Sequence, residues 1–229
     1  MTAGVGAVAA SGPADVCLEV TPGVLSAPEW SSVADSVTAA LEPRGALFPD
    51  PQVVTDDALL AVHSGHDGLA RGAEGCLRDG FEWTARFGRD FLEAGADQML
   101  TEAPTTPGIA SDVTIEWYPE EARLRTTLVF AGPLDIPNGH CWVDDALTVD
   151  AATGTVVASG EEGLETSPFA EAACGRFFDH LPEGGAGEQA VTLLPRSVVL
   201  ADGTTLHFVA EEVLVADDAV SVSGHLARD

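Results

Sequence analysis

The sequence predicts an α+β fold, in which a curved, mainly antiparallel β-sheet, barrel-like in its most closed form, is covered by three or four helices. Three observations support this prediction. Many short runs alternate apolar and polar residues, several of the segments between them are too short for a parallel crossover, and a few longer segments repeat apolar residues at helical spacing.

The clearest strands are four consecutive runs in the middle of the chain, at residues 113–118, 122–130, 140–149 and 155–159. Apolar and polar side chains alternate along each run, so that one face can pack on a core while the other meets water. Only three residues, 119–121, separate the first two runs. A connection of this length forms a hairpin, and we therefore expect antiparallel pairing.

The third run places a carboxylate on its apolar face. Asp145 alternates with Val143 and Leu147, and a carboxylate that points into a core must be hydrogen-bonded, paired or protonated. This position makes Asp145 the first candidate for a catalytic group. The alternative is a bulge that turns Asp145 outward beside Asp144.

The opposite face of the same run carries His140, Trp142 and Asp144. An imidazole and a carboxylate on one strand face can line a pocket wall, so His140 and Asp144 are candidates for a catalytic acid–base pair and Trp142 for a ligand contact. The alternative is an ordinary polar outer face of a sheet.

Helices are predicted in four segments, which begin near Ser26, Thr55, Asp79 and Ser167. The first is the best marked, because Glu29 follows Ser26 by three residues and can complete a capping box. The third carries aromatic residues at intervals of four, at positions 83, 87 and 91. These stripes predict helices that cover the sheet.

Arginines gather around the third predicted helix. Arg78, Arg86 and Arg89 bring three of the ten arginines into twelve residues, and Arg86 and Arg89 are candidates to bind an anionic small ligand. The alternative is a set of surface ion pairs with neighbouring carboxylates.

A metal site is predicted around His63, His66 and Asp67. On a helix, spacings of three and four place both imidazoles and the carboxylate on one face, which suits three metal ligands. Gly65 and Gly68 weaken the helix, and the alternative is a glycine-rich turn that contains two histidines. No fourth ligand is fixed by the spacing.

Charge narrows the choice of partners. The 229 residues include 37 acidic and 10 basic residues, all of the basic ones arginine, for a net charge of −27. Such a surface repels phosphate groups, so we expect neither direct nucleic-acid binding nor membrane binding. A GC-rich genome or adaptation to high salt accounts for a lysine-free, acidic composition without any functional cause.

We expect residues 1–14 to form a flexible N-terminal arm and residues 15–229 a single domain, with a division into 15–105 and 106–229 as the alternative. The arm has no basic residue and so does not resemble a secretory signal, and no apolar run is long enough to span a membrane. The predicted location is therefore cytoplasmic. The four cysteines are then expected to be buried small apolar residues, whereas two disulfides would form in an exported protein.

The chain contains no nucleophile elbow, dinucleotide-binding glycine motif, zinc protease motif, kinase motif or calcium loop, and its sequence identifies no cofactor. We expect a small-molecule-binding protein or a cofactor-independent enzyme that uses a pocket in the sheet. The first alternative is a non-catalytic subunit that contacts itself or another protein in an assembly. The second is a metal-binding protein centred on His63, His66 and Asp67.

Overall fold

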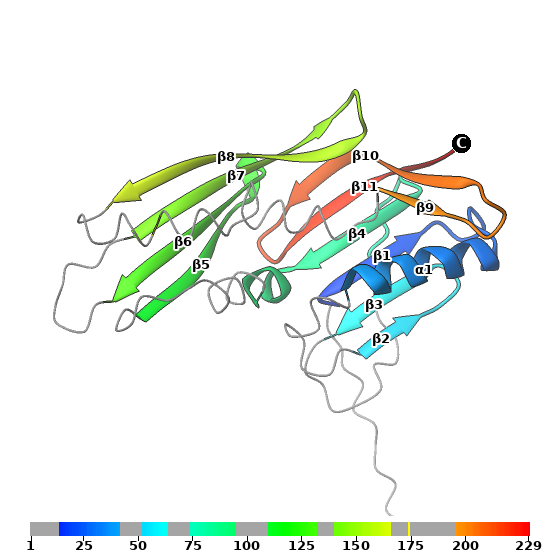
Figure 1. Cartoon of the computed structure of the whole chain (residues 1–229), viewed down its shortest axis with the longest axis horizontal. Helices are drawn as coiled ribbons and strands as arrows, with labels where there is room; N and C mark the ends of the chain where they lie inside the picture. Colours follow the sequence, from blue (N-terminus) through cyan, green and yellow to red (C-terminus); the bar gives the residue numbers. More distant parts are fainter. Residues whose placement is uncertain are drawn as a thin grey trace, which may run out of the picture.

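The computed structural model describes residues 14–41, 52–63, 74–94, 110–131, 140–165, 174 and 196–229. Strands make up most of this part of the chain, and they form two antiparallel sheets. The two sheets lie next to each other along the long axis of the molecule, with helix α1 across one face of the larger sheet (Figure 1).

The larger sheet has seven strands in the order β2-β3-β1-β4-β11-β10-β9. All neighbouring pairs are antiparallel. Its central strands β1 and β4 are rich in β-branched and aromatic residues and are almost wholly buried, as expected for strands covered on both faces. The bounds are β1 (Val16–Val20), β2 (Gln52–Thr55), β3 (Leu59–His63), β4 (Trp83–Gly88), β9 (Ser197–Val199), β10 (Thr205–Val215) and β11 (Ala219–Arg228).

The smaller sheet is a meander of four strands in sequence order, β5-β6-β7-β8. No register shift interrupts its pairing. The bounds are β5 (Ala110–Tyr118), β6 (Arg123–Ala131), β7 (His140–Asp150) and β8 (Thr155–Glu165), and a 3₁₀ turn, η2 (Pro119–Glu121), connects β5 to β6. Each of the four predicted runs lies within a strand, but β5 begins three residues earlier than predicted and β8 continues to Glu165, six residues beyond the predicted end.

Helix α1 (Ala27–Leu41) buries its apolar stripe against the larger sheet. The predicted cap is present, because the Glu29 carboxylate accepts hydrogen bonds from the backbone N–H of Ser26, at 2.7 Å, and from its hydroxyl, at 2.6 Å. These bonds also hold the pKa of Glu29 below its usual value.

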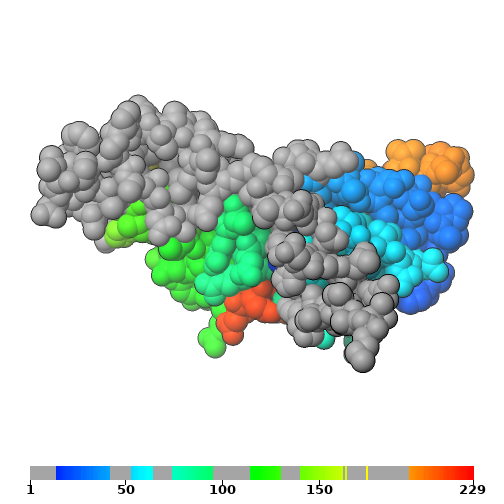
Figure 2. Space-filling view, turned by 90° about the horizontal axis from the view of Figure 1, so that it is seen from below, coloured from blue at the N-terminus to red at the C-terminus, as the bar shows by residue number. Residues whose placement is uncertain are grey.

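One hydrophobic core extends through both sheets. It includes residues of α1 and the larger sheet together with Ile115, Leu124, Leu147 and Val156 of the smaller sheet. The sheets meet where β10 packs against β7 and β8. Figure 2 shows green atoms of the smaller sheet next to red atoms of the C-terminal segment.

The prediction of an α+β fold with three or four covering helices is wrong, because the protein is mostly β. The segment that begins near Thr55 is a hairpin of β2 and β3, and the segment from Asp79 contains strand β4, with a helix only from residue 89 onward. Residues 83, 87 and 91 fit helical spacing, but residues 83, 85 and 87 also fit the alternation of a strand. The helix predicted from Ser167 lies outside the described residues, except for Cys174.

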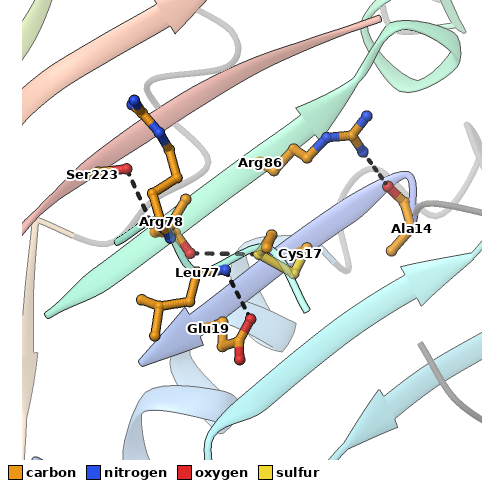
Figure 3. The surroundings of a disulfide bond; sticks show 9 residues. Ala14, Cys17, Glu19, Leu77, Arg78, Arg86 and Ser223 are labelled. Atoms are coloured by element: carbon orange, nitrogen blue, oxygen red, sulfur yellow. Dashed lines mark hydrogen bonds between the residues drawn. A yellow bond between two sulfur atoms is a disulfide. The ribbon is translucent and has the colours of Figure 1, made fainter. Parts of the chain in front are cut away.

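Both cysteine pairs are bonded, Cys17 to Cys76 and Cys141 to Cys174. This is the alternative that the sequence left open, and the expectation of four unpaired cysteines is not met. The first disulfide ties residues 74–78 to β1, where the Glu19 carboxylate also accepts a hydrogen bond from the backbone N–H of Leu77 (Figure 3). Among the described residues, no helix is long and apolar enough to cross a membrane.

Of the predicted N-terminal arm only Ala14 is described, and it is buried.

Candidate functional site: the two faces of the four-stranded sheet

The smaller sheet has two faces of different character. The inner face is the side of the sheet that joins the hydrophobic core through Ile115, Leu124 and Leu147. The outer face is the opposite side, which carries His140, Trp142 and Asp144. Residues directly opposite one another in an antiparallel pair share a face, so the register assigns every side chain of the sheet to one of these two sides.

Asp145 belongs to the inner face. It lies opposite Leu124 on one neighbouring strand and Gly160 on the other, and it is 0% exposed. The pairing has no shift at this point, so the bulge that would turn Asp145 outward is absent. Of the two orientations that the sequence left open, the inward one is observed, while a catalytic role for Asp145 stays a prediction.

Two further polar atoms lie on the inner face close to Asp145. Thr126 is opposite Ile115 and Val143, and Trp117 is opposite Leu124 in the same cross-strand row as Asp145. The Thr126 hydroxyl and the Trp117 indole N–H are buried and have no hydrogen-bond partner in the part of the chain that the structure describes. Buried polar groups are nearly always paired, so two exceptions on one sheet face need an explanation.

Sequence reasoning missed Thr126. The alternation itself held the information, because Thr126 stands between Leu124 and Leu128 on the apolar face of β6. Threonine is common on strand surfaces, and its type alone gave no reason to select it. Trp117 lies on the apolar face of β5, and only the burial of its indole nitrogen distinguishes it from an ordinary core residue.

On the outer face, Asp144 is held by two arginines of β6. Its carboxylate accepts hydrogen bonds from Arg125 Nη2 at 2.7 Å, Arg125 Nε at 2.8 Å and Arg123 Nη1 at 2.7 Å. The bond from Arg125 and then that from Arg123 hold the pKa of Asp144 below its usual value. A carboxylate stabilised in this way is a weak base.

His140 and Trp142 lie next to each other on the outer face, with ring centroids 5.7 Å apart. The Trp142 ring lies against Gly163 of β8 so closely that a Cβ there would collide with it. The acid–base pair of His140 and Asp144 stays a prediction, and the arginines on Asp144 weigh against it. Because Asp145 lies on the other face, these residues cannot all line one pocket.

The arginines predicted to bind an anion are engaged in ion pairs. Arg86 lies on β4 and donates to Asp218 at 2.7 Å and to the backbone carbonyl of Ala14 at 3.2 Å. Arg89 pairs with Glu93 at 2.6 Å. The guanidinium of Arg78 pairs with Glu212 at 2.7 Å. The structure thus favours the alternative of ion pairs, and anion binding here stays a prediction.

The predicted metal site is placed only in part. His63 ends strand β3, not a helical turn, and its Nε2 is buried without a hydrogen-bond partner among the described residues. His66 and Asp67 lie outside the described residues. Within the described ranges, no three side chains of the metal-binding types are grouped to hold an ion.

Comparison with known proteins does not assign this chain to a class. No protein-family model and no curated protein matches it. A crystal structure of a lipopolysaccharide binding protein is similar over 95% of this chain and 51% of that chain, at 7% identity and a TM-score of 0.30. This chain therefore spans about half the length of that protein, and a likeness this weak supports no functional argument.

Proposed function

We propose that this protein binds a small molecule against the inner face of the four-stranded sheet. The observation that carries the proposal is the pair of buried polar atoms, Thr126 Oγ1 and Trp117 Nε1, which have no partner among the described residues and point to the same side of the sheet. Leaving a buried donor unpaired costs about 1–3 kcal/mol, and a bound molecule would recover that free energy.

The two groups restrict the chemistry of the ligand. An indole N–H is a donor only, so the ligand must present an acceptor oxygen or nitrogen to Trp117, and the hydroxyl of Thr126 can donate or accept. The surrounding side chains, Ile115, Leu124 and Val143, are apolar. A mainly apolar molecule with a carbonyl, ester or ether oxygen fits these demands. The buried carboxylate of Asp145 lies in the cross-strand row next to that of Thr126.

A substitution tests the site. Thr126→Val keeps the shape of the side chain and removes the hydroxyl, and Thr127→Val makes the same change on the outer face as a matched control. We expect the first variant to copurify with less ligand than the wild type and the second to retain it, when solvent extracts are compared by mass spectrometry. Equal ligand content in both variants would overturn the proposal.

We further propose that the protein functions in an oxidising compartment and not in the cytoplasm as first expected. Disulfides persist in secreted, periplasmic and surface proteins and are rare in the cytosol, and this chain has two. Alkylation of thiols at the moment of cell lysis tests this point. Protected cysteines are expected, and four alkylated cysteines would restore the cytoplasmic assignment.

Metal binding stays a second candidate, favoured by the buried Nε2 of His63, which has no hydrogen-bond partner among the described residues. Its test is elemental analysis of the purified protein and of variants His63→Ala and His66→Ala. Metal content that both substitutions reduce would support it, and content that neither changes would exclude it.

A further inference from the structure

The outer face of the four-stranded sheet carries a fixed array of aromatic and arginine side chains, which we call the outer platform: Tyr118, Arg123, Arg125, Trp142 and Asp144. Its members come from three adjacent strands. The array lies on the opposite side of the sheet from the binding site proposed for the inner face.

Each member of the outer platform is held in place by another. The guanidinium of Arg123 lies 3.9 Å above the centroid of the Tyr118 ring, and that of Arg125 lies 5.4 Å from the centroid of the Trp142 ring. Both arginines also donate to Asp144. Side chains that are already fixed lose little conformational entropy on binding, which favours their use as a contact surface.

The composition of the outer platform is that of a protein contact. Tryptophan, tyrosine and arginine are the residues most enriched among the energetic centres of interfaces. The exposed apolar side chains Val129 and Val157, at 36% and 43% exposure, lie on the same face. A surface with fixed aromatic rings and accessible apolar area is suited to packing against another chain.

The charges around the outer platform identify the partner. Asp144 and Glu121 neutralise the two arginines, while Glu116, Glu120 and Glu161 remain exposed around them. The outer platform together with these four surrounding glutamates is therefore negative in sum, and the chain as a whole carries −27. A second copy of this chain, nucleic acid or an anionic membrane would be repelled, whereas a basic protein segment is complementary.

We infer that the outer platform docks a basic segment of another protein, whose lysine or arginine side chains pair with the exposed glutamates while their aliphatic stems pack on Trp142. Long cationic side chains commonly bury their stems in this way. This docking requires both the exposed glutamates and the fixed aromatic surface. A general attraction to an acidic protein would require the charges alone.

A titration calorimetry experiment tests the inference with a short arginine- and lysine-rich peptide as the probe. The double variant Glu116→Gln/Glu161→Gln removes two charges at the platform. The matched control Glu74→Gln/Asp217→Asn removes two charges from exposed positions elsewhere. We expect the platform variant to weaken binding about fivefold to tenfold and the control less than twofold.

A third variant separates packing from charge. Trp142→Ala should weaken binding about fivefold or more without any change in net charge. Thermal unfolding of each variant is measured first, so that loss of binding is compared only among folded proteins. Equal weakening by the platform and control charge variants, binding that Trp142→Ala does not change, or no binding by the wild type would each overturn the inference.

Discussion

The backbone N–H of Ala210 donates a hydrogen bond of 2.7 Å to the carbonyl of Gly154. Gly154 lies in the turn between β7 and β8, and Ala210 lies on β10 at a bulge where the pairing with β11 shifts. The bulge frees the N–H group of Ala210 from the hydrogen-bond ladder of its sheet, and the Gly154 carbonyl in the hairpin of the smaller sheet accepts the hydrogen bond. This contact joins the two sheets.

Substitution of Gly154 tests the importance of that contact. Its φ of +62° disfavours any residue with a Cβ, and a Cβ there would collide with Val209 Cγ1. We expect Gly154→Ala to lower the free energy of unfolding by about 2–4 kcal/mol, measured by urea denaturation.

Gly23→Ala is the control for that change. Gly23 has a φ of +86°, but a Cβ there would meet no atom within 4 Å. We expect Gly23→Ala to lower the free energy of unfolding by only about 1 kcal/mol, because the left-handed backbone conformation is the single unfavourable contribution. Adding Val209→Ala to Gly154→Ala should recover part of the loss. Equal costs for the two glycine substitutions would show that the sheets do not depend on close packing at Gly154.

The disulfide between Cys17 and Cys76 closes a loop with a sequence separation of 59. Constraint of the unfolded chain predicts that Cys17→Ala/Cys76→Ala lowers the free energy of unfolding by about 4 kcal/mol. Urea denaturation of this variant, compared with Cys141→Ala/Cys174→Ala, measures the contribution of each bond. A variant as stable as the wild type would mean that the hydrogen bonds of residues 74–78 suffice to hold that segment.

The ion pairs of Asp144 predict a specific pH dependence. Because the folded-state pKa of Asp144 lies below the ordinary value of an aspartate carboxyl, its contribution to stability is complete above that ordinary value. The contribution is lost as the pH falls through the lower folded-state pKa. We expect Asp144→Asn to destabilise the protein by about 1–2 kcal/mol at pH 7 and by progressively less below pH 4.

Urea denaturation at a series of pH values measures this dependence. Asp217→Asn is the control, because Asp217 is exposed and lies outside the outer platform. If the difference in the free energy of unfolding between wild type and Asp144→Asn stays constant down to the lowest pH measured, the arginines do not hold the carboxylate ionised.

In the ligand-free protein, Thr126→Val should increase stability, in contrast to the loss of ligand expected from the same substitution. Replacing an unpaired buried hydroxyl by a methyl group removes a desolvation penalty, so we expect the free energy of unfolding to rise by about 1 kcal/mol after the ligand is extracted. Thermal unfolding of the extracted proteins measures the change. A clear loss of stability would mean that the hydroxyl has a structural partner.

Much of the smaller sheet could be predicted from the sequence. The period-2 alternation fixed its four strands and the inward side of Asp145, because a one-residue shift would expose the whole apolar face. Helix α1 was equally clear, since its cap and its stripe agree. These are segments in which local pattern and tertiary packing favour the same structure.

The larger sheet was harder, for a physical reason. Strand β4 alternates apolar residues with Thr84 and Arg86, but the spacing of its aromatic residues also suits a helix, so the local pattern does not decide between the two. Its partners β1 and β11 are distant in sequence. The disulfide of Cys17 with Cys76 and the ion pair of Arg86 with Asp218 depend on this long-range pairing, which no local pattern encodes.

The measurement that tests the central claim most directly is native mass spectrometry of gently purified wild-type protein, compared with the mass of the denatured chain. Binding at the inner face predicts an added mass in the range of a small organic molecule, which denaturation releases and Thr126→Val reduces. If the protein is still folded after purification and its native mass equals that of the bare chain, the proposed function is contradicted.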